Sequence, residues 1–220
     1  MGGQLDEAPS EAVQIRLHRS ESWLRKSKKA GSSTPPDLDA QFVFLWIAFN
    51  ALYGKPRYRD DVQGEEVSDF KRFLTTVEAL SRAGVASALR HPGVEEHVEW
   101  LLQSPFLNIE CWRQWDRSGI RDRQRRIDVA RNTYDKQHPT VSVFLQLYTL
   151  RNQILHGAAT DGGRRTRESL RHAIPVLDAS VRMLIGLVKT HHRKIPALDP
   201  VPYPPSVGEA VPFNAARFRR

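Results

Sequence analysis

An arginine, an asparagine and a histidine stand at the end of an apolar segment, residues 145–157, which reads LQLYTLRNQILHG. Arg151 and Asn152 occupy positions where a helix interior usually carries leucine or alanine. His156 falls on the last turn, and Gly157 is a typical helix terminator. An imidazole can move protons, and a guanidinium can hold a phosphate. The pair could therefore cleave RNA without a metal ion.

Spacing alone does not select Arg151 and His156. The chain is rich in arginine, so an arginine followed by a histidine after four to six residues is expected about three times by chance. The sequence contains five such pairs. The other four are Arg90/His97, Arg131/His138, Arg165/His172 and Arg167/His172.

The setting of Arg151 distinguishes it from the other arginines. On an ideal helix it lies within about 40° of Phe144 and Leu155, so it stands in an apolar stripe. A guanidinium there is costly unless it pairs or holds an anion. Asn152 and His156 are four residues apart, and we expect a hydrogen bond between them that orients the imidazole. In the structural alternative, Arg151 pairs with a buried acid and His156 only caps the helix.

The charge balance indicates a polyanionic partner. The formal net charge is +8, whereas the 40% of hydrophobic residues are ordinary for a globular protein. Nucleic acid is the simplest such partner, and a solvated basic surface is the alternative. The arginines that we expect to contact RNA are Arg121, Arg123, Arg125, Arg126, Arg164 and Arg165.

Several classes of protein are disfavoured. The single cysteine, Cys111, rules out a disulfide within the chain and suits a reducing cytoplasm. The first ten residues lack the apolar run of a secretory signal, and the uncharged run 41–54 is too short to span a bilayer. The sequence has no phosphate-binding glycine motif and no clustered metal ligands. We therefore expect a cytoplasmic protein with no membrane span, cofactor or metal.

The hydrophobic period is helical from residue 11 to residue 192, with no alternating strand. We expect Thr34 to be the N-cap and Pro35 the first residue of the second helix. Trp46 should pack in the core, and Asn50 needs a partner, which we expect near Arg151. Pro175 predicts a kink or two successive helices. The expected helices are 11–29, 35–53, 67–83, 85–90, 94–102, 106–115, 140–156 and 164–192.

Composition divides the chain into three parts. Residues 1–10 are polar and predicted to be a flexible N-terminus, and residues 11–194 form the helical domain. Residues 195–220 are rich in proline and have no period. This tail is either disordered or an extended strap over the body.

Three segments together resemble the HEPN superfamily of helical RNA-cutting and RNA-binding domains. RNQILHG, residues 151–157, matches the family signature of an arginine, four to six residues and a histidine, with asparagine after the arginine. FVFLWIAFNALYG, residues 42–54, is similar to a core helix of a bacterial HEPN subfamily. AIPVLDASVRMLIGLV, residues 173–188, looks like the long helix of the same subfamily.

The resemblance implies an all-α, HEPN-like helical bundle with additional helices and an extended C-terminal tail. It also implies a homodimer with a composite active site, and a metal-independent endoribonuclease that acts as a toxin-like stress or phage-defence effector. His156 would move protons at the ribose 2′-OH and the leaving 5′-oxygen, Arg151 would hold the phosphate, and Asn152 would support His156. The products would be 2′,3′-cyclic phosphate and 5′-OH ends.

The chain departs from one subgroup of the family at the second residue after His156. A toxin subgroup has a tyrosine two residues after the histidine, which a nucleotidyltransferase modifies, whereas this chain has Ala158 there. We therefore do not predict that regulation, although another regulatory protein partner remains open. The family also includes members without catalysis, so the alternative is a non-catalytic module that binds RNA or a protein.

Overall fold

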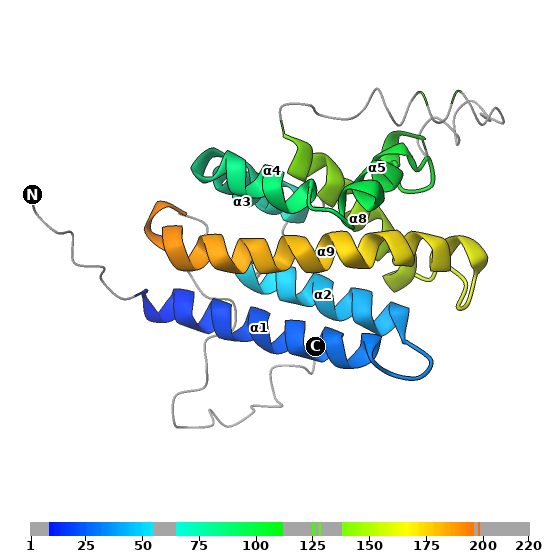
Figure 1. Cartoon of the computed structure of the whole chain (residues 1–220), viewed down its shortest axis with the longest axis horizontal. Helices are drawn as coiled ribbons and strands as arrows, with labels where there is room; N and C mark the ends of the chain where they lie inside the picture. The colour runs from blue at the N-terminus through cyan, green and yellow to red at the C-terminus, as the bar shows by residue number, and fades with distance from the viewer. Residues whose placement is uncertain are drawn as a thin grey trace, which may run out of the picture.

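The computed structural model describes residues 9–54, 65–111, 125, 128, 138–195 and 198. Within these ranges the protein is all-α, with no strand, as the hydrophobic period predicts. Figure 1 shows α1 (Glu11–Gly31), α2 (Leu38–Tyr53) and α9 (Arg164–His191) lying side by side, with α3, α4 and α5 on the other side of α9 and α8 passing behind it. None of the described helices combines the length and apolarity needed to cross a membrane.

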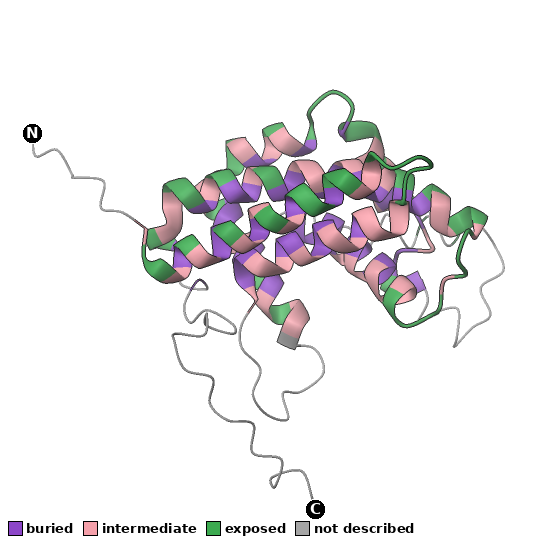
Figure 2. Ribbon diagram, turned by 90° about the horizontal axis from the view of Figure 1, so that it is seen from below, coloured by how far each residue is buried: buried purple, intermediate pink, exposed green. Residues whose placement is uncertain are grey.

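Helix α2 is the centre of the core. It contacts α1, α3, α8 and α9. None of its residues is exposed, and its buried face includes Phe42, Leu45 and Trp46. The Phe49 ring packs against Phe144 of α8 with the ring centroids 4.3 Å apart. Figure 2 shows the buried residues concentrated on the inner faces of the helices. The prediction that Trp46 packs in the core is therefore confirmed.

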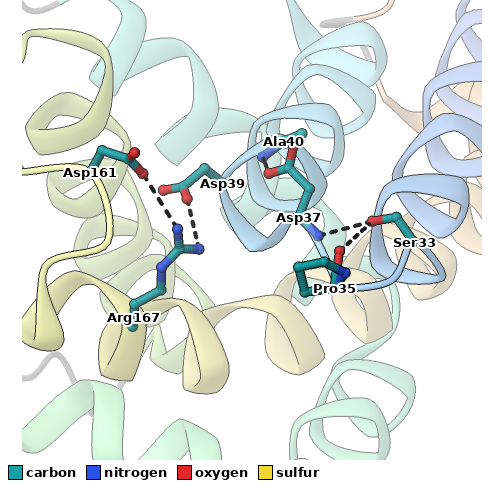
Figure 3. A network of polar contacts seen from close by, with 7 residues as sticks. All are labelled: Ser33, Pro35, Asp37, Asp39, Ala40, Asp161 and Arg167. Atoms are coloured by element: carbon teal, nitrogen blue, oxygen red, sulfur yellow. Dashed lines mark hydrogen bonds and ion pairs between the residues drawn. The ribbon is translucent and has the colours of Figure 1, made fainter.

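The start of α2 differs from the prediction. Asp37, not Thr34, is the N-cap, and its carboxylate accepts a hydrogen bond from the Ala40 backbone N–H at 2.9 Å (Figure 3). Pro35 precedes a second proline, Pro36, which disfavours the helical region for the residue before it. Pro35 therefore cannot be the first helical residue, and the helix begins after both prolines.

Three further helices pack against α9: α3 (Glu65–Leu80), α4 (Arg82–Leu89) and α5 (Glu95–Gln103). The predicted helix 67–83 is thus divided at Ser81, which is the N-cap of α4. Of the predicted helix 106–115, residues 109–111 are helical and the following residues lie outside the described ranges.

A buried carboxylate fixes the beginning of α8 (Pro139–Leu155). Glu78, near the end of α3, accepts hydrogen bonds from the Thr140 backbone N–H at 2.9 Å and from His138 Nδ1 at 3.0 Å. A negative charge at a helix N-terminus is favourable because the first N–H groups have no partners within the helix. Helix α8 is therefore held in place by α3, across a sequence separation of about sixty residues.

Helix α9 is continuous through Pro175, so the predicted alternative of two successive helices is wrong. Its buried face continues on both sides of the proline, with Leu170 and Ile174 before it and Leu177 and Val181 after it. Packing of this face against α2 outweighs the loss of one backbone hydrogen bond. A short 3-10 helix, η1 (His192–Lys194), follows.

The beginning of the predicted tail packs on the helical body. Ile195 and Leu198 are buried in the core. Arg16 of α1 is fully buried, and its Nε donates to the Leu198 carbonyl at 2.6 Å. Its Nη1 donates to the Gly54 carbonyl at 2.8 Å. One side chain thus joins α1, the end of α2 and the segment after α9, whereas residues 199–220 lie outside the described ranges.

We expect Arg16→Met to lower the free energy of unfolding by about 2 to 5 kcal/mol, because buried carbonyls lose charge-assisted hydrogen bonds. Chemical denaturation measures this change. Arg25→Met is the matched control, because Arg25 is exposed on the same helix and its loss should cost less than about 0.5 kcal/mol. Equal effects of the two substitutions would contradict the assigned role of Arg16.

Two histidines meet where α5 packs against α9. His97 Nδ1 lies 2.9 Å from His172 Nδ1, and the His172 ring stacks on Trp100 with the centroids 4.2 Å apart. Burial lowers the pKa of His172 below its ordinary value of 6.5, and the nearby His97 lowers it further. Glu168 and Glu96 act in the opposite direction. The neutral form of His172 is therefore favoured in the folded protein.

Folded His172 binds a proton less readily than unfolded His172. The free energy of unfolding should therefore fall as the pH drops from about 6.5 through the lowered pKa of the folded state. We expect His172→Gln to lose part of this acid destabilisation, measured as the difference in Tm between about pH 7.5 and about pH 5.5. His91→Gln, at an exposed histidine, should retain the wild-type difference. The same difference in all three proteins would refute the role of His172.

Candidate functional site

The predicted motif lies where α8 leaves the core. From Thr140 to Leu150 most residues of α8 are buried, whereas Leu155 is 50% exposed and His156 lies in solvent. His156 is the C-cap, and Gly157 follows with φ +71°, a left-handed conformation that favours glycine. The helix therefore carries the motif from the core to the surface within its last two turns.

Arg151 is held in place but only partly paired. Its side chain is 20% exposed, and its Nη1 donates to Asn152 Oδ1 at 2.8 Å. Its Nη2 lies 3.8 Å from Glu66 Oε1, which is an ion pair but too long for a hydrogen bond. Its guanidinium carbon lies 5.9 Å from the centroid of the Tyr148 ring. Its Nε is buried and has no hydrogen-bond partner within the described residues.

Asn152 does not orient His156 as predicted. Its side-chain oxygen accepts from Arg151, and no hydrogen bond joins its side chain to that of His156; the His156 backbone N–H donates to the Asn152 carbonyl at 3.0 Å, as the helix requires. A charged guanidinium on the adjacent residue is a stronger donor than an imidazole in solvent. The predicted contact between Asn50 and the Arg151 region is likewise wrong, because Asn50 Oδ1 accepts from the Tyr53 hydroxyl at 2.8 Å.

His156 differs from the histidines of the other arginine–histidine pairs. His97 and His172 contact each other, and His138 contacts Glu78. His156 is exposed, and its side chain makes no hydrogen bond or ion pair with any other described residue. Among the histidines of the five arginine–histidine pairs, His156 is therefore the one whose imidazole is available to bind a ligand.

The arginine of another pair has a structural role. Arg167 Nη1 lies 2.8 Å from Asp39 Oδ2 at the start of α2, and its Nη2 lies 3.4 Å from Asp161 Oδ1. Figure 3 shows this arginine between the two carboxylates. Because Asp161 belongs to the loop after Gly157, these ion pairs join that loop to the body of the protein. Arg167 is therefore engaged within the fold.

The six arginines predicted to bind RNA lie in two segments of the chain, residues 121–126 and residues 164–165. Arg164 and Arg165 are exposed on the first turn of α9, and the Arg165 guanidinium carbon lies 4.3 Å from the centroid of the Phe106 ring. Arg125 is exposed. Arg121, Arg123 and Arg126 lie outside the described residues.

A groove of about 760 Å³ adjoins the motif, and no feature of the sequence predicted it as a site. It is bounded by α3, residues 106–109, α8, the loop after Gly157 and the first turns of α9. Gln153 Nε2 donates to the Phe106 carbonyl at 2.8 Å and so fixes one wall. Asn152 lines the groove, whereas Arg151 and His156 do not. The polar residues recurring along α8 at Thr149, Asn152 and Gln153 were the only sequence signal of this surface.

The apolar and aromatic residues of the groove are Val67, Phe106, Ile109, Leu145, Tyr148, Ala158 and Ala159. Its charged residues are Lys71 and Arg165, and no residue of its described lining carries a carboxylate. Elsewhere in the described ranges, no three His, Cys, Asp or Glu side chains gather as metal ligands would.

Comparison of the chain with protein-family models, with curated proteins and with solved structures gave no match.

Proposed function

We propose that this protein is a metal-independent endoribonuclease built on a HEPN-like helical bundle, and that it serves as a toxin-like stress or phage-defence effector. One observation carries the proposal: the partly paired guanidinium of Arg151 and the unpartnered imidazole of His156 lie on the last turns of one helix. A half-buried cation without full compensation is costly, and a phosphate would supply the missing charge. The net charge of +8 suits a polyanionic substrate.

The proposed reaction is an internal displacement at phosphorus. The ribose 2′-oxygen forms a bond to phosphorus while the bond from phosphorus to the 5′-oxygen breaks, leaving a 2′,3′-cyclic phosphate and a 5′-OH. An imidazole of His156 accepts the proton from the 2′-OH or delivers one to the departing 5′-oxygen. Arg151 binds the phosphate oxygens and stabilises their charge in the transition state. Asn152 supports this through its hydrogen bond to Arg151.

We further propose a homodimer in which the two motifs act together. Base and acid must lie on opposite sides of the phosphorus in this reaction, and each chain brings one His156 to the site. The exposed side chains of Leu155 and His156 leave the end of α8 open to a second copy. Two copies of α8 would then supply the two imidazoles and two guanidinium groups around one phosphate.

A non-catalytic module that binds RNA or a protein is the second candidate. The ion pair of Arg151 with Glu66 favours it, since the arginine then serves to anchor α8 on α3. On this reading, replacing Arg151 destabilises the fold, and replacing His156 has no effect on any activity.

We expect the purified protein to cleave mixed total RNA in the presence of EDTA, and His156→Ala to lower the rate at least about 100-fold. Arg151→Ala should have a comparable effect because it removes the phosphate contact. Gel analysis of the fragments measures the rates. Circular dichroism and Tm establish that the variants are folded, and His156, being exposed, should tolerate replacement.

The matched controls are His18→Ala and Arg90→Ala, at an exposed histidine and an exposed arginine outside the motif, and both should retain the wild-type rate. Cleavage that persists in folded His156→Ala would refute the assigned site. Absence of RNA cleavage by the wild type, with loss of fold in Arg151→Ala, would support the non-catalytic module instead.

A further inference from the structure

We propose that the groove beside Asn152 binds an unpaired nucleotide of the RNA strand, with the base against its aromatic wall and a phosphate at Arg165 and Lys71. The inference rests on the proposed function and extends it, because it adds a substrate subsite outside the arginine–histidine pair. The groove volume of about 760 Å³ lies within the range of about 300 to 1,000 Å³ that is typical of small-molecule sites.

The walls of the groove suit a flat aromatic group. Phe106 and Tyr148 line it, together with the aliphatic side chains of Val67 and Leu145. Bases bind to proteins by stacking on aromatic rings and on arginine planes. The guanidinium carbon of Arg165 lies over the Phe106 ring, 4.3 Å from its centroid, so both a ring and a guanidinium are available to a base in the groove.

The charges of the groove select an anionic ligand. Lys71 and Arg165 line the groove from two different helices, α3 and α9, and neither pairs with a carboxylate among the described residues. A purely apolar ligand would leave both cations without a partner, whereas a phosphate attached to the base would pair with them. This complementarity favours a nucleotide over a hydrocarbon chain.

The amide of Asn152, which lines the groove, can recognise the base. The amide nitrogen of Asn152 has no hydrogen-bond partner among the described residues, because only the oxygen of this amide is engaged by Arg151. An amide of this kind hydrogen-bonds to the edges of unpaired bases. Asn152 also joins the two parts of the site, since it lines the groove and contacts Arg151. A nucleotide in the groove would therefore neighbour the scissile phosphate.

The test uses the His156→Ala protein, which should bind RNA without cleaving it. Fluorescence anisotropy measures the affinity for a labelled single-stranded RNA of mixed sequence. We expect Arg165→Ala to weaken binding about 10-fold and to reduce the salt dependence by about one phosphate contact. Ala159→Phe, which fills the groove, should weaken binding at least as much. Arg171→Ala is the control, at an exposed arginine on α9 outside the groove.

The possible results distinguish failure of the nucleotide subsite from failure of the proposed nuclease function. RNA binding and wild-type cleavage that are unchanged by Arg165→Ala and Ala159→Phe would overturn the subsite and leave the nuclease proposal intact. Absence of RNA binding and of cleavage would overturn both. Binding of free AMP or ATP that Ala159→Phe abolishes, without RNA binding, would show a free nucleotide as the occupant and overturn the assignment to RNA.

Discussion

No residue of helix α2 is exposed, and the rest of the bundle follows from this constraint. A helix with Phe42, Leu45 and Phe49 fully buried has to be enclosed by other helices, and α1, α3, α8 and α9 enclose it. The hydrophobic effect stabilises this arrangement in proportion to the apolar area removed from water. Because α8 contributes Phe144 to the packing around Phe49, the position of α8 is set by the core rather than by the site.

The placement of α8 has a direct consequence for chemistry. Its N-terminus is fixed by the Glu78 carboxylate, and its body is buried, so its last two turns emerge at a defined point on the surface. Arg151 lies at this boundary, where Asn152, Glu66 and Tyr148 restrict the guanidinium without neutralising it fully. A cation that is oriented before a ligand arrives loses less entropy on binding. We infer that the cost of leaving Arg151 partly unpaired is offset when a phosphate binds.

Much of the fold could be predicted because its signals are local. Apolar periodicity located the end of α2, the terminator Gly157 located the end of α8, and the helical period of residues 164–192 located α9. The predictions of helix boundaries and helix continuity were wrong where an adjacent residue or a distant packing contact determines the structure. Because Pro36 follows Pro35, α2 begins at Leu38 instead of Pro35. Packing against α2 stabilises α9 as one continuous helix through Pro175.

The candidate site was predictable only in part, for the same reason. The residues of the motif were identified from the sequence, but the partner of Asn152 depended on competition between two donors. The groove is formed by α3, residues 106–109, α8 and α9, which are far apart in the chain. No local sequence pattern indicates that Lys71 and Arg165 line the same groove, because this depends on how the helices pack in the folded protein.

The most direct measurement identifies the attacking group of the reaction. An RNA that the full-length protein cleaves at a mapped position would be compared with the same RNA carrying a 2′-O-methyl group at that position, and the ends of the products would be determined by mass spectrometry. We expect a 2′,3′-cyclic phosphate and a 5′-OH from the first RNA and loss of cleavage at the methylated position, because the 2′-oxygen is the attacking group. Undiminished cleavage of the methylated RNA, or products with 5′-phosphate ends, would contradict it.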